Sequence, residues 1–368
     1  MAKNEKISSY QLTVLIITTI LGTSVIFVPS ITAKYAEQSG WISVLIAFTA
    51  GVFAIFITTI LGRRFPDQTI IEYCGQIIGR WPGKALGMSY VIFYTITGAT
   101  IVREFTALLN SMFLPQTPAL VIAFFLILMG AAAVSKGLEV IVRANEFIIP
   151  LFLGSVFAVI LLVMGEVDLK ELTPVAECGL QKILLSSVVP VGWFTESTVL
   201  LVLIPYLNAP NESTRAGIKA IAAVTMIQII IFVTTVTVLG PEITANHNYS
   251  FLNLARYIRI AEFLTRVEPL VMIAWVTGVT IKISVFYYVT VASAAQVLGM
   301  KDYRLLVIPF GLAFIILSLI LWQNSVQLVI FLEQIWPIFL AFPFQILIPL
   351  ILLILALLRK KRGAQSGK

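Results

Sequence analysis

The sequence predicts an all-α integral membrane protein with about ten transmembrane helices, arranged as five plus five. Apolar residues make up 59% of the 368 residues and charged residues only 12%, and the mean hydropathy is +0.99. A water-soluble core with a polar shell does not reach this balance, so we expect the surrounding solvent to be lipid. The apolar residues fall into long runs, and the first run of each half contains a Gly- and Pro-rich interruption.

Ten runs approach the length of about 20 apolar residues that a helix needs to cross the hydrocarbon core. The first half contains runs at 10–33, 41–61, 83–110, 118–135 and 144–164, and the second half contains runs at 182–206, 216–240, 268–297, 304–322 and 327–357. We therefore predict one polytopic domain over residues 1–368. Its first repeat covers about 10–164, its second covers about 182–357, and a basic tail follows at 358–368.

The distribution of Lys and Arg predicts that both termini face the cytoplasm, because basic residues are retained on that side. With this orientation, seventeen of the 25 basic residues fall in inner segments and six in outer ones, which leaves Arg103 and Lys282 at membrane depth. Residues 66–80 are too short to span and have apolar residues at helical spacing, so we expect a helix on the inner surface. The NLARYIRIAEFL stretch of the outer loop 241–268 has the same character.

Other classes of function lack the necessary residues. The net charge of +7 comes from short basic clusters between apolar runs, not from a stripe that would follow nucleic acid. Cys74 and Cys178 are isolated and His247 is the single histidine, so we expect no disulfide framework, no metal site and no Ser-His-Asp chemistry. We expect neither an enzyme nor a bound cofactor.

The interruptions in spans one and six predict a binding site at the middle of the membrane. A loose peptide group is costly in lipid, so a helix break must face protein or water. Its free N–H groups suit a carboxylate and its free carbonyls suit an ammonium group, as in a zwitterionic amino acid. The alternative is that small residues simply permit close helix packing. The candidate residues at the breaks are Gly22, Thr23, Ser24, Val25 and Ile26 in span one, and Gly192, Trp193, Phe194 and Glu196 in span six.

Lys282 lies about fifteen residues inside span eight, where an unpaired charge is costly. It shares a helix face with Gly278 and Phe286. Two interpretations remain open: the ammonium group contacts a ligand carboxylate or replaces a coupling cation, or it forms a structural ion pair with Glu196 or Glu104. Glu196 in turn is a candidate counter-ion, ligand acceptor or titrating group.

Span three contributes weaker candidates. Arg103 and Glu104 are adjacent, so they point to different sides of the helix, and we expect a structural role for both. Phe93, Tyr94 and Thr97 share a face and are candidates for a pocket wall, although packing is the common role of such aromatic residues. Four tryptophans near the span ends are predicted interfacial anchors, namely Trp41, Trp81, Trp322 and Trp336.

An ordered set of segments resembles the spore germination permease family, the B subunit of the nutrient germinant receptors of endospore-forming bacteria. The segments are ILGTSVIFVPS, EYCGQIIGRWPGK, VREFTALLN and GWFTES, followed by the basic tail. That family is similar to the amino acid, polyamine and organocation transporters. The resemblance therefore implies an amino acid permease-like fold of two inverted five-helix repeats with unwound helices 1 and 6. It also implies a complex with an A-type membrane subunit and a C-type lipoprotein in the spore inner membrane.

The first functional hypothesis is a receptor subunit that binds a small nutrient germinant, such as an amino acid, and signals through partner subunits. The alternative is a proton- or ion-coupled amino acid permease. An inert scaffold is disfavoured because Lys282 and the interrupted helices would then be unexplained costs.

Overall fold

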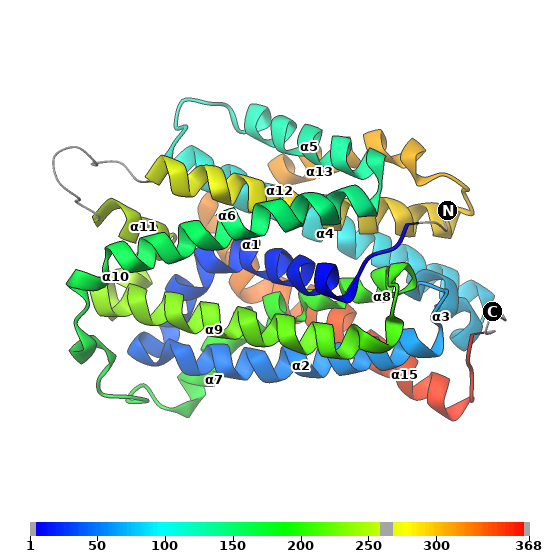
Figure 1. Cartoon of the computed structure of the whole chain (residues 1–368), viewed down its shortest axis with the longest axis horizontal. Helices are drawn as coiled ribbons and strands as arrows, with labels where there is room; N and C mark the ends of the chain where they lie inside the picture. Colours follow the sequence, from blue (N-terminus) through cyan, green and yellow to red (C-terminus); the bar gives the residue numbers. More distant parts are fainter. Residues whose placement is uncertain (1–4, 258–267, 364–368) are drawn as a thin grey trace.

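The computed structural model describes residues 5–257 and 268–363, and in this part of the chain it is helical apart from turns and one isolated β-bridge. The NLARYIRIAEFL stretch lies partly outside the described residues, as does the end of the basic tail. Membrane-length helical segments form a bundle whose two ends carry the connecting loops (Figure 1). The spans are α1 (Ser9–Ala36), α2 (Gly40–Arg64), α4 (Arg80–Met112), α5 (Ala119–Lys136), α6 (Leu138–Leu162), α7 (Leu180–Phe194) with its continuation to Tyr206, α9 (Ser213–Leu239), α12 (Glu268–Leu298), α13 (Val307–Ile320), and α14 (Ser325–Ile330) with its continuation to Leu358.

The described residues contain nine helical segments that are long and apolar enough to cross a membrane. One of them, Ser9–Arg64, has 56 residues, which corresponds to about 84 Å of helix, far more than one bilayer core. It contains α1 and α2, which contact each other and are separated by the short turn η1 (Glu37–Ser39). Counting these two helices separately gives the predicted ten spans.

Short elements connect the spans. A helix is present within the predicted segment 66–80, and a Thr69–Glu72 capping box starts it. This helix is α3 (Ile70–Ile78). Further connecting elements of the described chain are η2 (Met164–Glu166), η3 (Leu169–Leu172), η6 (Pro210–Glu212), α10 (Pro241–Asn246), α11 (Ser250–Tyr257) and η7 (Tyr303–Leu306).

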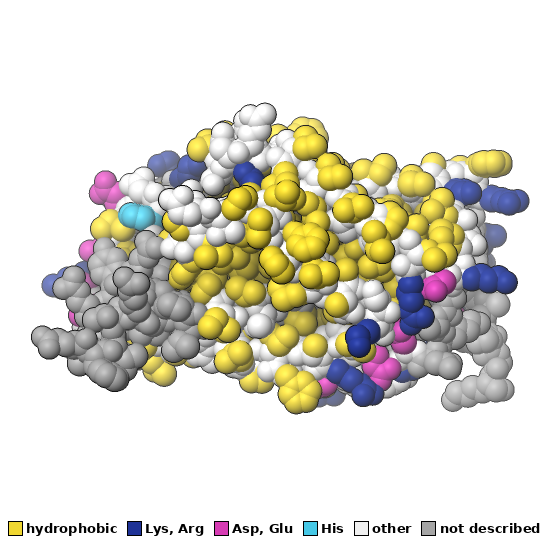
Figure 2. All heavy atoms as spheres, turned by 90° about the horizontal axis from the view of Figure 1, so that it is seen from above, with side chains coloured by type: hydrophobic (Ala, Val, Ile, Leu, Met, Phe, Trp, Pro, Cys, Tyr) yellow, Lys and Arg dark blue, Asp and Glu magenta, His cyan; other side chains and the backbone are white. Residues whose placement is uncertain are grey.

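The outer surface of the bundle is apolar at its middle. Figure 2 shows hydrophobic side chains over the centre of one face, with most of the visible charged side chains toward its two ends. Helices α1 and α12 lie inside the bundle. Helix α1 contacts α6, α7, α9 and α12, and α12 also contacts α4 and α5. Polar groups on α1 and α12 are therefore shielded from lipid by neighbouring helices.

The tenth span is wider than a regular α-helix along half of its length. Between α14 and α15 (Ile348–Leu358), residues Phe331–Leu347 form the π-helical stretch η8, which contains Pro337 and Pro343. Proline lacks the N–H group that the α-helical bond pattern needs, and a wider turn accommodates that loss. The sequence predicted a plain span here.

The N-terminal segment is attached to both halves of the chain. Ile7 forms a parallel bridge with Leu207, through a bond from Ile7 N to Tyr206 O (2.8 Å) and one from Asn208 N to Ile7 O (2.9 Å). The Glu5 carboxylate accepts from Leu138 N at 2.9 Å, at the start of α6. Both described ends of the chain lie at the same end of the bundle (Figure 1).

The two cysteines provide a test of this arrangement. Cys178 is half-buried in the loop after the fifth span, opposite the N-terminus by span count, whereas Cys74 is 1% exposed in α3 and burial raises its pKa to about 11. In intact cells, we expect a membrane-impermeant maleimide to label Cys178 and not Cys74, because the thiolate is the reacting species. Mass spectrometry of the labelled peptides measures this. Loss of labelling in Cys178→Ser is the control, and labelling of Cys178 only after permeabilisation would contradict the orientation.

Candidate functional site

A buried ion pair joins the eighth span to the sixth. The Nζ of Lys282 lies 2.8 Å from Oε2 and 3.1 Å from Oε1 of Glu196, and it donates to Oγ1 of Thr23 at 2.8 Å. Lys282 and Thr23 are 0% exposed and Glu196 is 2% exposed. An ammonium group in this position requires such partners because transfer from water costs several kcal/mol. Of the two partners proposed from the sequence, the structure pairs Lys282 with Glu196.

Glu196 is placed by a break in the sixth span. Helix α7 ends at Phe194, and the tighter turn η4 (Thr195–Val199) carries Glu196 before α8 (Leu200–Leu203) and η5 (Ile204–Tyr206) complete the span. The hydroxyl of Thr195 bonds the side chain of Gln345 in η8. The opened backbone predicted around Pro190 and Gly192 is not seen: the span stays helical and only tightens at Thr195. We call the turn η4 the break of the sixth span.

Gly192 does not open the helix. It lies within α7, and a Cβ at this position would overlap the ring of Trp336. Gly192 is thus required for close approach of η8, in the way that small residues permit helix packing in membranes. Trp336 is 2% exposed and Trp322 is 3% exposed, so both are core residues and their prediction as interfacial anchors was wrong. Trp81, by contrast, is 79% exposed.

The predicted break in the first span was wrong. Helix α1 is continuous from Ser9 to Ala36, with Pro29 inside it. A Cβ at Gly22 would lie 3.4 Å from Cβ and Cδ of Lys282, so this glycine lets the lysine stem lie against α1. The ammonium group is held by the Thr23 side chain and not by freed backbone carbonyls, so the helix has no need to unwind.

A second carboxylate belongs to the same cluster. Glu104 on α4 is 2% exposed, interacts with the Thr23 hydroxyl, and is close enough to Lys282 and Glu196 for their charges to act on it. Its Oε2 atom has no hydrogen-bond partner. Lys282 therefore pairs with Glu196, and Glu104 is a second buried carboxylate that shares Thr23 with Lys282. We call Thr23, Glu104, Glu196 and Lys282 the charged cluster.

Arg103, which precedes Glu104 on α4, forms no ion pair within 4.0 Å with a residue of the charged cluster. It is 9% exposed, and its Nε has no hydrogen-bond partner.

Two buried hydroxyls, each next in sequence to a residue of the charged cluster, have no hydrogen-bond partner. Ser24 follows Thr23 in α1 and Ser197 follows Glu196 in η4, and both are at most 1% exposed. A buried hydroxyl without a partner costs about 1–3 kcal/mol. Such unsatisfied groups beside charges are typical of a position that binds a polar ligand or water.

An aromatic cover lies between the charged cluster and one end of the bundle. Phe27 is one helical turn beyond Thr23, and its ring centroid lies 6.2 Å from that of Trp193 and 5.6 Å from that of Tyr249. A cavity of about 150 Å³ lies beyond Phe27, lined by residues that include Ser30, Lys34 and Glu333. Sequence reasoning missed Phe27, although its spacing of four residues from Thr23 places both on one face.

An ion pair crosses this outer cavity. The Nζ of Lys34 lies 3.0 and 2.8 Å from the two carboxylate oxygens of Glu333, and the Tyr35 hydroxyl also donates to Glu333. Sequence reasoning missed this pair because Lys34 and Glu333 belong to the first and last spans. Phe27 thus belongs both to the aromatic cover and to the lining of this cavity.

Three predicted site residues on α4 lie away from the charged cluster. Phe93 stacks on Phe344 with ring centroids 4.8 Å apart, and it also contacts Tyr94. Tyr94 precedes Glu104 by ten residues, or about 15 Å along the helix. The Thr97 hydroxyl is buried without a partner. Their helical spacing predicts a common face of α4, but their depth along the helix sets them apart from the charged cluster.

The remaining predicted residues pack around the charged cluster. A Cβ at Gly278 would lie 2.9 Å from the ring of Phe152 in α6, so this glycine permits close packing of α12. The others are at most 1% exposed within the apolar core: Val25, Ile26, Phe194 and Phe286.

The chain is similar to proteins of one family over nearly all of its length. The family described as "Spore germination protein" matches residues 6–326. Spore germination protein KB of Bacillus subtilis (strain 168) is 27% identical over 365 residues, which cover 98% of this chain and 97% of that protein. Spore germination protein YndE of the same organism is 24% identical over 80% of this chain and 82% of that protein.

Solved transporters share the fold. A crystal structure of MhsT in complex with L-phenylalanine has a TM-score of 0.63 at 14% identity, covering 96% of this chain and 99% of that one. A Na⁺-coupled sialic acid symporter in a substrate-bound outward-open state has a TM-score of 0.66 at 13% identity, covering 91% of this chain and 79% of that one. The predicted amino acid permease-like fold is confirmed.

The buried ion pair makes a prediction about stability. Lys282→Met leaves the Glu196 carboxylate buried without its cation, so we expect it to lower the free energy of unfolding by about 3–5 kcal/mol. The double variant Lys282→Met/Glu196→Gln should recover part of this loss. Thermal unfolding in detergent measures both. Lys219→Met removes an exposed lysine and should change stability by less than about 0.5 kcal/mol, and equal melting of Lys282→Met and the wild type would contradict the prediction.

Proposed function

Since this chain belongs to the spore germination protein family, we propose that it is the membrane subunit of a germinant receptor that binds a small nutrient at the charged cluster. The observation that carries the proposal is the buried Lys282–Glu196 pair at the break of the sixth span. An ammonium group beside two carboxylates is complementary to a zwitterion. The ligand class proposed is therefore an amino acid or a similarly small polar nutrient.

The ligand would bind by exchanging partners with the protein. Its carboxylate takes the place of Glu196 beside Lys282, and its ammonium group is accepted by Glu104 and the released Glu196. The hydroxyls of Ser24 and Ser197, which lack partners, supply further hydrogen bonds. Because a zwitterion brings no net charge, this exchange leaves the net charge of the buried cluster unchanged, which favours binding away from water.

Signalling requires that the ligand prefer one of two conformations. The position of Glu196 on η4 supports such a preference, because releasing its bond to Lys282 removes a tie between α12 and the break. The aromatic cover of Phe27, Trp193 and Tyr249 must also move to admit the ligand. A ligand that stabilises the rearranged form shifts the population toward it in proportion to its differential affinity.

The proposal includes partners and a location. We infer that an A-type membrane subunit and a C-type lipoprotein detect the change, in the spore inner membrane, with both termini in the cytoplasm. The resemblance to receptor B subunits supports the partners and the membrane. The basic residues of the C-terminal tail support the orientation.

A secondary transporter is the second candidate, and the fold shared with a Na⁺-coupled symporter favours it. In this version, a proton or ion gradient drives amino acid uptake. The Lys282 ammonium group favours the receptor. It is a fixed positive charge within the charged cluster, and it can take the place of the coupling cation that a transporter would bind and release.

Ligand binding can be measured by thermal stabilisation of the purified chain with a panel of nutrients. A zwitterionic ligand at one hundred times its Kd should stabilise the protein by about 2.7 kcal/mol, and its N-acetyl and amide derivatives should not, because each lacks one charge. Lys282→Met should abolish the shift. Retention of the full ligand shift in that variant would sink the proposed site, whereas a chain that responds to no nutrient would support the scaffold.

Uptake of the same radiolabelled nutrient into proteoliposomes separates the two candidates. The receptor proposal expects saturable binding without accumulation, and it expects co-purification with an A-type subunit from spores. Accumulation driven by an imposed proton or sodium gradient would establish the transporter.

A further inference from the structure

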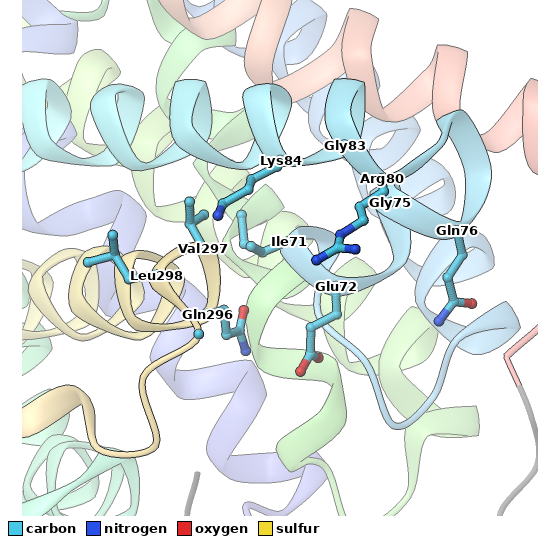
Figure 3. Close-up of a pocket in the computed structure, with 11 residues that line it drawn as sticks. Ile71, Glu72, Gly75, Gln76, Arg80, Gly83, Lys84, Gln296, Val297 and Leu298 are labelled. Carbon is cyan, nitrogen blue, oxygen red and sulfur yellow. The ribbon is translucent and has the colours of Figure 1, made fainter.

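A second polar cavity lies at the end of the bundle that carries the termini, remote from the charged cluster. It has a volume of about 330 Å³ and is bounded by α3, the start of α4 and the end of α12 (Figure 3). Gln296, which lines it, follows Lys282 by fourteen residues on α12, or about 21 Å along the helix. The cavity is therefore a separate site and does not depend on the proposed germinant site.

Two cationic side chains face this cavity. Arg80 and Lys84 are one turn apart at the start of α4, and in Figure 3 both extend toward the space between α3 and α12. Among the described residues, neither takes part in an ion pair within 4.0 Å. The helix dipole adds partial positive charge at this end of α4.

Two of the other polar residues of the cavity are engaged within the protein. The Glu72 carboxylate accepts from Thr69 N at 2.9 Å and so caps α3. Gln296 Oε1 accepts from the Thr69 hydroxyl at 2.6 Å. Gln76, which also lines the cavity, is uncharged. The cationic groups of the cavity are thus Arg80 and Lys84, and the chemistry that fits their charge and their hydrogen-bond donors is a phosphate group.

Exposed apolar side chains lie at the cavity or close in sequence to its basic residues. Trp81, next to Arg80, is 79% exposed, Leu298 is 56% exposed, and Met88, one turn beyond Lys84, is 41% exposed. An exposed tryptophan beside basic residues at a helix end is typical of the headgroup level of a bilayer. A free phosphate ion makes no favourable contact with exposed apolar side chains, whereas the acyl chains of a phospholipid pack against them.

We propose that this cavity binds the headgroup of an anionic phospholipid, with its phosphate held by Arg80 and Lys84. The bound lipid connects α4 to α12, the helices that carry Glu104 and Lys282 of the charged cluster. The volume of the cavity lies at the lower end of the range for small-molecule sites. This volume suits a headgroup and is larger than one phosphate requires.

The test is a thermal-shift titration of the purified full chain with short-chain phosphatidylglycerol, phosphatidylcholine and inorganic phosphate. We expect saturable stabilisation by phosphatidylglycerol alone. Arg80→Gln/Lys84→Gln should weaken it by about tenfold or more, since each basic residue near an anionic surface contributes about 1 kcal/mol. The matched control Arg215→Gln/Lys219→Gln removes the same charges at the same spacing from another polar cavity, between α1 and α9, and should leave the affinity unchanged.

A second variant tests the cavity without altering charge. A Cβ at Gly75 would meet no atom within 4 Å, so Gly75→Leu fills space in the cavity, favours the helix and should fold. It should weaken phosphatidylglycerol binding to a similar degree. Equal loss in the matched control, full affinity in Gly75→Leu, or equal stabilisation by inorganic phosphate would each overturn the proposal.

Discussion

A single ammonium group at membrane depth constrains the arrangement of the central helices. Lys282 cannot reach water, so the chain must supply acceptors from elsewhere, and it does so from α1 and from the break of the sixth span. The tighter turn η4 carries Glu196, whose carboxylate lies against Lys282. The break and the buried lysine therefore depend on each other. Glu196 on the break offsets the cost of burying the lysine charge, and the lysine offsets the cost of burying the Glu196 carboxylate.

The glycines near the charged cluster allow neighbouring side chains to approach the helix backbone closely, and they are not needed for flexibility. Gly22 admits the Lys282 stem, Gly192 admits Trp336, and Gly278 admits Phe152. Each leaves out a side chain at a helix crossing: Gly22 between α1 and α12, Gly192 between α7 and η8, and Gly278 between α12 and α6. Close packing without solvent is the main source of helix association within lipid. The result is a polar centre enclosed by tightly packed helices.

The spans were predictable because hydropathy is a property of each segment alone. The details of the site were not, because they depend on pairs of residues distant in sequence. The sequence offered Glu196 and Glu104 equally as partners of Lys282, and only the packing of three helices brings both carboxylates near it. Gly22 and Gly192 indicated breaks because an opened backbone and a close crossing need the same small residue. Helical spacing fixed the common face of Phe93 and Tyr94, but their depth relative to Lys282 depends on how α4 slides against α12. Trp336 looked interfacial by position, and the π-helical stretch turns it inward against Gly192.

The bridge between Ile7 and Leu207 has a consequence for the order of assembly. The partner of Ile7 is made 200 residues later, so during synthesis at about 5–20 residues per second the N-terminal segment waits roughly 10–40 s before it can pair. The first five helices can enter the membrane in that interval, but their N-terminal edge stays open. Completion of the first half therefore waits on the sixth span, the one that carries Glu196. The N-terminal segment therefore becomes bridged to Leu207 only once the proposed binding position has been synthesised.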